Sequence, residues 1–118
     1  MHFINHVQLL GRAGSDAATE LLSDGSRIAR LRLYQSPGQR SAAADPTCFQ
    51  LVAWNGVAEQ LHARVHRGDR LLVQGKLVNR QGRHGDAEFV RTEVHVTHFA
   101  VLASRKQGAT THCDNRLV

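Results

Sequence analysis

Alternation of apolar and polar side chains is clearest between Arg67 and Arg80, where the chain reads R-G-D-R-L-L-V-Q-G-K-L-V-N-R. Gly68-Asp69 is a turn signal, and the residues after it alternate with the period of two that a strand requires. One face is apolar and carries Leu71, Val73 and Leu77. The other is polar and basic and carries Gln74, Lys76 and Arg80, with Leu72 and Val78. Gly75 interrupts the run, as glycine does at a bulge or a tight barrel bend. The segment therefore predicts a curved barrel strand with a positively charged outer face.

The same alternation predicts four more strands. They are Ile4 to Arg12, Arg27 to Tyr34, Thr47 to Trp54 and Glu88 to Leu102. Their inner faces are expected to carry Ala29, Leu31, Leu33, Phe49, Leu51, Ala53, Val90, Val94 and Val96. Their outer faces are expected to carry Ile28, Arg30, Arg32, Tyr34, Cys48, Gln50, Val52, Trp54, Phe89, Arg91, Glu93 and His95.

A short helix is predicted between the third strand and the Arg67–Arg80 strand. Asn55 is a good N-cap, and apolar residues follow at helical spacing at Val57, Leu61 and Val65. Gly68 can supply the left-handed C-cap. The remaining segments read as loops: a polar loop from Gly14 to Gly25, a second from Ser36 to Pro46, a hairpin loop from Gln81 to Asp86, and a loose tail from Ser104.

Composition limits the class of protein. With 118 residues, 42% of them hydrophobic, the chain is long enough for one domain with a modest core. Fifteen Lys and Arg against ten Asp and Glu give a formal charge of +5, which favours a polyanionic partner, nucleic acid first and an acidic membrane surface second. A merely solvated basic surface is the simpler alternative. No stretch resembles a signal peptide or a membrane span, and two cysteines, Cys48 and Cys113, fit a reducing cytoplasm.

The outer faces of the second and third strands offer a surface for nucleic acid. Arginines beside an aromatic ring can hold phosphates and stack bases, as Arg30, Arg32 and Tyr34 would. The alternative is a solvent face with a tyrosine at its rim. Trp54 on an outer face indicates an interface, although the helix or a second subunit could equally cover it.

Three strands, a short helix and a two-strand hairpin follow the order of an OB-fold. We therefore expect an all-β protein, a five-stranded Greek-key barrel with one short helix between strands 3 and 4. In that fold the second and third strands, with flanking loops, bind oligonucleotides. The barrel is expected to span residues 1–103, with a flexible tail over 104–118.

Four pieces of the sequence make the resemblance more specific. They are N-H-V-Q-L-L-G-R-A-G-S-D at Asn5 to Asp16, V-A-W-N-G-V-A-E at Val52 to Glu59, R-G-D-R-L-L-V-Q-G-K-L at Arg67 to Leu77, and R-T-E-V at Arg91 to Val94. In this order and spacing they resemble the bacterial-type single-stranded-DNA-binding proteins, over roughly Asn5 to Leu102.

This resemblance implies a binding protein that coats single-stranded DNA without sequence preference, in replication, recombination or repair. It implies a homo-oligomer, with a tetramer favoured over a dimer, in the cytoplasm at the nucleoid, and leaves RNA binding open. Trp54 occupies a family stacking position. Arg12, Arg30, Arg32, Lys76, Arg80 and Arg91 are similar to the family's basic contacts. The candidate set is completed by Tyr34, Phe89 and Arg83.

The sequence also departs from the family pattern. Family aromatic positions fall at Cys48, near Pro37 to Gln39 and near Gly82, where this chain has no ring. Affinity should therefore depend more on charge. The family ends in an acidic tip that recruits replication and repair enzymes, whereas this chain ends T-H-C-D-N-R-L-V. It resembles either a truncated member or a tailless primosome-type relative, so the alternative function is an OB adaptor that binds single-stranded DNA weakly and docks replication proteins.

Catalysis is not expected. His62 and His66 are one helical turn apart, a spacing that could ligate a metal, but a solvated basic helix face explains them more simply. There are no paired carboxylates on a shared face, no nucleophile elbow and no phosphate-cradling loop. A metal-dependent nuclease would need clustered acids. We therefore expect no cofactor and no metal.

Overall fold

The computed structural model describes residues 2–36 and 47–104, which form six strands and one helix. The elements are β1 (Val7–Ala13), β2 (Ala18–Leu21), β3 (Arg27–Gln35), β4 (Thr47–Trp54), α1 (Asn55–Arg64), β5 (Arg70–His84) and β6 (Ala87–Ala103). Nearly all of the predicted loop between Ser36 and Pro46, and the predicted tail beyond Ser104, lie outside the described residues.

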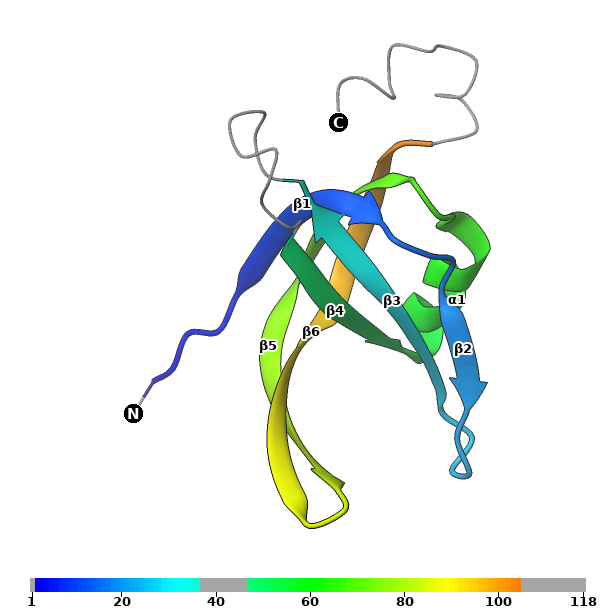
Figure 1. Ribbon diagram of the computed structural model, residues 1–118. Coiled ribbons are helices and arrows are strands. Elements are labelled where there is room, and N and C mark those ends of the chain that lie inside the picture. The colour runs from blue at the N-terminus through cyan, green and yellow to red at the C-terminus, as the bar shows by residue number, and fades with distance from the viewer. Residues whose placement is uncertain (1, 37–46, 105–118) are drawn as a thin grey trace.

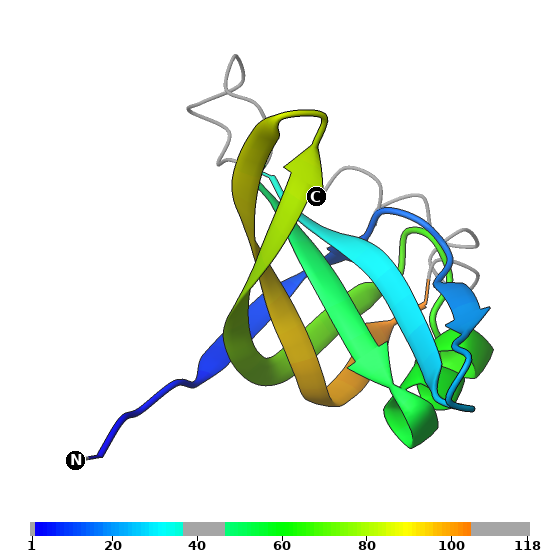
Figure 2. The same cartoon turned by 90° about the horizontal axis from the view of Figure 1, so that it is seen from below.

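Five of the strands close into a ring. The sheet order is β1-β5-β6-β4-β3-β2, and an additional β1–β3 pairing joins its two sides. All neighbours are antiparallel except β4 and β6, which run parallel. The ring can be followed in Figures 1 and 2, with α1 at one end of it. The predicted all-β OB-fold is confirmed, with the helix between the third and fourth strands of the ring.

The polar loop predicted from Gly14 to Gly25 is wrong in one respect, because it contains β2. This strand adds to the free edge of β3, with Ala18 opposite Arg30 and Leu21 opposite Arg27. All four of its side chains are exposed, so the sequence had no alternation by which to show it. Backbone pairing with β3 alone makes the segment a strand.

The core fills the ring from the inner faces of its strands. Leu33, Leu51, Leu71 and Val73 are almost fully buried there, as the alternation predicted. The predicted bend at Gly75 is also confirmed. The β5–β6 register shifts between Gln74 and Gly75, and a Cβ built at Gly75 would lie 2.1 Å from the carbonyl oxygen of His95. Glycine is therefore needed where the two backbones approach each other.

Beyond Leu77, which pairs with Val94, β5 and β6 leave the ring as a projecting hairpin (Figure 1). Leu77 and Val90, both predicted to face inward, are 44% and 62% exposed. Alternation gives the face of a residue but not whether anything covers that face.

The predicted hairpin loop is also wrong. Strand pairing continues to His84 opposite Ala87, and only Gly85, with a φ of 62°, and Asp86 form the turn.

Both predicted helix caps differ in the structure. Asn55 is the first residue of α1 rather than its N-cap, and has a φ of 50°. Its side-chain oxygen accepts a hydrogen bond of 3.0 Å from the backbone N–H of Arg27, so it ties the helix start to β3. The C-cap position is Val65. Gly68 has a φ of 91° and donates its N–H to the carbonyl of Ala13, so it serves the following turn. Among the described residues no helix has the length and apolar character needed to cross a membrane.

Candidate nucleic-acid interface

The outer faces of β3, β4, β6 and β5 form one surface, because these strands are neighbours in the ring. One row of residues crosses it: Arg30 pairs with Val52, Val52 with His95, and His95 with Lys76. Ile28 and Val52 lie on this face, as predicted, but each is only 1% exposed.

Tyr34 and the β3 arginines surround a first hollow of ≈ 370 Å³ on this surface. Arg30, Arg32, Tyr34 and Gln50 line it. The tyrosine ring lies directly against the backbone of Gly14, where an added Cβ would be 2.0 Å from the ring. The ring is thus fixed at the edge of the hollow, beside two cationic side chains.

A second hollow, of ≈ 250 Å³, lies where the projecting hairpin meets β3. It is lined by Arg30, Arg80, Gln81, Gly82, Phe89, Arg91 and Glu93. Phe89 pairs with Gly82 across the hairpin, and its ring occupies the space that a side chain at Gly82 would fill, since an added Cβ would lie 2.3 Å from it. The Arg91 guanidinium carbon lies 5.4 Å from the centre of the Phe89 ring, within cation–π range.

Arg30 lines both hollows and so joins them into one surface. We call this surface the basic track; it consists of Arg30, Arg32, Tyr34, Arg80, Phe89 and Arg91. Arg30 has an acidic neighbour, Glu20 on β2, 3.9 Å away, and both side chains are about half exposed. Exposed ion pairs of this kind contribute little, so a phosphate can replace Glu20 at small cost. The track combines cations and rings as single-strand recognition requires.

Trp54 and Lys76 lie on the same outer surface, beside the basic track. Trp54 ends β4 and is 39% exposed. The centre of its ring is 6.4 Å from that of His95, at a tilt of 58°. Lys76 is exposed and pairs with His95 across β5 and β6. In the single chain, α1 therefore leaves much of the tryptophan accessible to a base.

Arg12 is not brought to the basic track, whereas Arg83 lies beside it and lines a further hollow together with Phe89. Arg12 is part-buried and donates a hydrogen bond of 2.9 Å to the carbonyl of Gly68, which holds β1 to the turn before β5. Arg83 donates to Glu88 at 2.8 Å, near the tip of the hairpin. Contact of either residue with DNA stays a prediction.

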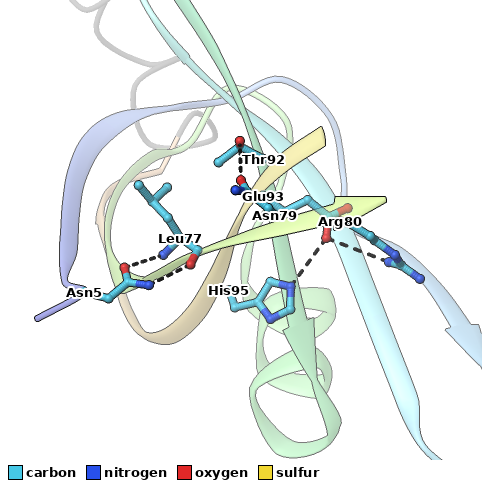
Figure 3. A network of polar contacts seen from close by, with 7 residues as sticks. All are labelled: Asn5, Leu77, Asn79, Arg80, Thr92, Glu93 and His95. Carbon is cyan, nitrogen blue, oxygen red and sulfur yellow. Dashed lines mark hydrogen bonds and ion pairs between the residues drawn. The ribbon is translucent and has the colours of Figure 1, made fainter. Parts of the chain in front are cut away.

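Glu93 is the residue whose role the sequence did not indicate. Alternation placed it on the outer face, yet it is only 5% exposed. Figure 3 shows its carboxylate between two basic side chains: Oε1 lies 3.8 Å from Nη1 of Arg80 and 3.4 Å from Nε2 of His95. In the same view the side-chain amide of Asn5 makes two hydrogen bonds to the backbone of Leu77. A strand pattern cannot show such burial, because it depends on which neighbours cover the outer face.

Metal chemistry finds no support in this surface. Within residues 2–36 and 47–104, no group of three or more His, Cys, Asp or Glu side chains is arranged to hold a metal ion. Among the described residues, the carboxyl of Asp24 has a shifted pKa. The backbone N–H of Ser26 donates to Asp24 and holds the pKa of that carboxyl below its ordinary value, but it lies in the β2–β3 turn and not on the basic track.

Comparison with known proteins gives consistent matches. Residues 4–102 match the family model described as "Single-strand binding protein family". The chain is 32% identical over 76 residues to single-stranded DNA-binding protein 2 of Nostoc sp., which covers 64% of this chain and 58% of that protein. It is 28% identical to the single-stranded DNA-binding protein of Bacteroides thetaiotaomicron, over 92% of this chain and 70% of the relative. Single-stranded DNA-binding protein 1 of Synechocystis sp. is 23% identical, over 95% and 94% of the two chains. The chain thus spans little more than half the length of the Nostoc relative.

Proposed function

Since the chain belongs to the single-strand binding protein family, we propose that it binds single-stranded DNA without sequence preference, as a non-enzymatic protein acting in replication, recombination or repair. The relatives named above are single-stranded DNA-binding proteins. The family match covers residues 4–102, which include all strands of the ring. Binding of this kind needs accessible cations and rings rather than a reacting group.

The basic track is the observation that supports this function most directly. Its four arginines come from β3, β5 and β6, and its two rings from β3 and β6. Arginines would neutralise successive phosphates, and Tyr34 and Phe89 would stack bases. A single strand can turn its bases toward the rings, whereas a duplex keeps its bases paired and stacked inside. The arrangement therefore favours single strands over duplex DNA.

Fluorescence anisotropy of labelled DNA tests the proposal. The protein is titrated into labelled oligo-dT and into a duplex of equal length at matched salt. We expect the single strand to bind at least tenfold more tightly. Equal affinity for the two would contradict the proposal, and so would absence of binding to either.

Trp54 provides a second test, because it is the chain's single tryptophan and is partly exposed. Its fluorescence should be quenched by saturating oligo-dT, and the quenching should weaken as salt rises. Binding seen by anisotropy without quenching would remove Trp54 from the set of stacking residues while leaving the basic track in place.

The family also suggests how the chain assembles, and we propose a homo-oligomer, with a tetramer favoured over a dimer. Exposed apolar side chains support association: Phe3 and Ile4 are 83% and 95% exposed, and Leu10 and Leu77 are 41% and 44% exposed. Burying such a surface against other copies is favourable. Light scattering on the eluted protein would give the mass, and a monomeric mass at working concentration would contradict the proposal.

Location and protein partners follow from the same function. We expect the protein at the nucleoid in the cytoplasm, where single strands arise. Docking of replication or repair proteins is a separate hypothesis, for which pull-down from nuclease-treated lysate is the test. Partners retained without DNA would support the adaptor role, and their loss on nuclease treatment would assign them to the DNA.

A further inference from the structure

A carboxylate lies inside the most basic hollow of the surface, and the proposed function does not account for it. Glu93 lines the second hollow, where the hairpin meets β3, together with Arg30, Arg80 and Arg91. We call it the hairpin hollow. A negative charge there repels phosphate and lowers the affinity for any polyanion. Coating DNA by charge alone would therefore be better served by a neutral residue, and this makes Glu93 a candidate for contact with a different part of the nucleotide.

The geometry leaves Glu93 able to accept a further hydrogen bond. Its contacts with Arg80 and His95 both use Oε1. A carboxylate has about four lone-pair sites over its two oxygens, so Oε2 keeps acceptor capacity that the described residues do not use. Arg80 and His95 hold the carboxylate in place from two sides. It is thus an ordered acceptor on the wall of the hollow.

The other walls of the hollow suit a nucleobase. Phe89 is 40% exposed and presents a ring on which a base can stack, beside the Arg91 guanidinium that already contacts the ring. Arg30 and Arg91 can hold the phosphates on either side of a base that enters. The edge of that base would then approach Glu93.

A carboxylate distinguishes the two pyrimidines by their edges. Cytosine carries an amino group at N4, which donates to Glu or Asp. Thymine carries a carbonyl oxygen at that position, which a carboxylate repels, and its one ring N–H lies between two carbonyls. The two rings are nearly equal in size, so the difference rests on the donor and not on fit.

We propose that Glu93 is a specificity-determining residue that favours bases bearing an amino group, cytosine over thymine in particular, in the hairpin hollow. This inference rests on the proposed function and refines it: binding stays permissive along the basic track, and one position acquires a base preference. Arg80 and His95 act as positioning residues for the carboxylate.

The test compares oligo-dC with oligo-dT at neutral pH and matched salt, for the wild-type protein and two variants. Glu93→Gln removes the charge, and its amide can turn either its oxygen or its NH2 group toward a base. Glu59→Gln is the matched control, because Glu59 is an exposed carboxylate on α1 and does not line the hollow. Each variant loses one negative charge, so both change the general attraction to phosphates equally. The ratio of the dC and dT affinities therefore reports base recognition alone.

We expect Glu93→Gln to lower the dC:dT affinity ratio about three- to tenfold, the size of one lost hydrogen bond to a base edge. Glu59→Gln should leave the ratio unchanged while raising both affinities slightly. An unchanged ratio in a folded Glu93→Gln variant would overturn the proposal. An equal fall of the dC:dT affinity ratio in both variants would also overturn it.

A second measurement needs no variant and remains informative if Glu93→Gln does not fold. Wild-type protein is titrated with an oligonucleotide of 2-pyrimidinone, which is cytosine without its amino group. We expect it to bind several-fold more weakly than oligo-dC. Equal affinity would contradict the role of Glu93 while leaving single-strand binding intact, whereas absence of binding to all three oligonucleotides would contradict the proposed function itself.

Discussion

Gly82 and Phe89 show how the identity of one residue depends on the residue opposite. The resemblance to the family predicted an aromatic position near Gly82, where this chain has no ring. The hairpin register nevertheless sets Phe89 opposite Gly82, and the Phe89 ring covers the glycine backbone. A ring is therefore present at the place where the sequence indicated its loss, because the partner strand supplies it.

Phe89→Ala should weaken binding to oligo-dT by about 1–3 kcal/mol, the range for one stacked base, which is a rise in Kd of roughly fivefold to a hundredfold or more. Leu102→Ala is the control, since Leu102 is also exposed on β6 but lies at the other end of the strand. Anisotropy titration measures both. Equal affinities for the two variants would show that Phe89 is not a stacking residue.

At the scale of single elements, the bend of β5 requires the glycine at Gly75, whereas α1 does not require the glycine at Gly56. Gly75 faces the backbone of His95, whereas a Cβ at Gly56, in α1, would meet nothing within 4 Å. Gly75→Ala should destabilise the fold by roughly 1–3 kcal/mol or more, because backbone atoms must move. Gly56→Ala should stabilise it by roughly 0.5–1 kcal/mol. Thermal unfolding measures both, and equal shifts would contradict the close approach.

The turn between β2 and β3 should respond to acid through Asp24. The pKa of its carboxyl is lowered in the folded state, because the ionised form accepts the hydrogen bonds of Ser26. The contribution of Asp24 to the free energy of unfolding is therefore present above the ordinary pKa of the side chain. It is lost as the pH falls through the lowered pKa. Wild type should unfold at a higher temperature than Asp24→Ala at pH 7, and the difference should vanish in strong acid. If the difference in unfolding temperature between wild type and Asp24→Ala did not change with pH, the effect would not come from ionisation of Asp24.

At the scale of the whole molecule, the basic track should make binding strongly dependent on salt. Its four arginines, if each meets one phosphate, predict a slope of log Kobs against log salt of about −3 per chain, at about −0.7 for each phosphate of a single strand. Titration of oligo-dT over a range of salt gives the slope. A slope near zero would contradict a track that works by charge.

A single charge removed from the track should change that slope. Arg91→Gln should reduce its magnitude by somewhat less than one and weaken binding to all sequences alike. Arg70→Gln removes the same charge at the far end of β5, distant from the hairpin, and should leave the slope nearly unchanged. Equal slopes for both variants would indicate attraction by net charge rather than contact along the track.

The sequence predicted much of the ring but little of its outer surface. Thr47–Trp54 has the predicted bounds. The predicted inward positions of β3 and β4 are buried, except for Phe49, which is only partly buried. They are buried because a strand inside a closed sheet must alternate. The sequence missed β2, whose side chains are all exposed. It also placed Leu77 and Val90 inside, since alternation does not reveal where a hairpin leaves the ring.

Alternation, turn residues and charge by themselves determined the class of fold, the order of the five ring strands and the helix, and the basic character of the outer face. Each of these depends on residues close together in the chain. Only the tertiary structure decided which arginines share a hollow, that Arg12 instead contacts the Gly68 carbonyl, and that Glu93 is buried among cations. Such contacts depend on strand register and ring closure, which bring together residues far apart in the sequence, and no local pattern encodes those distances.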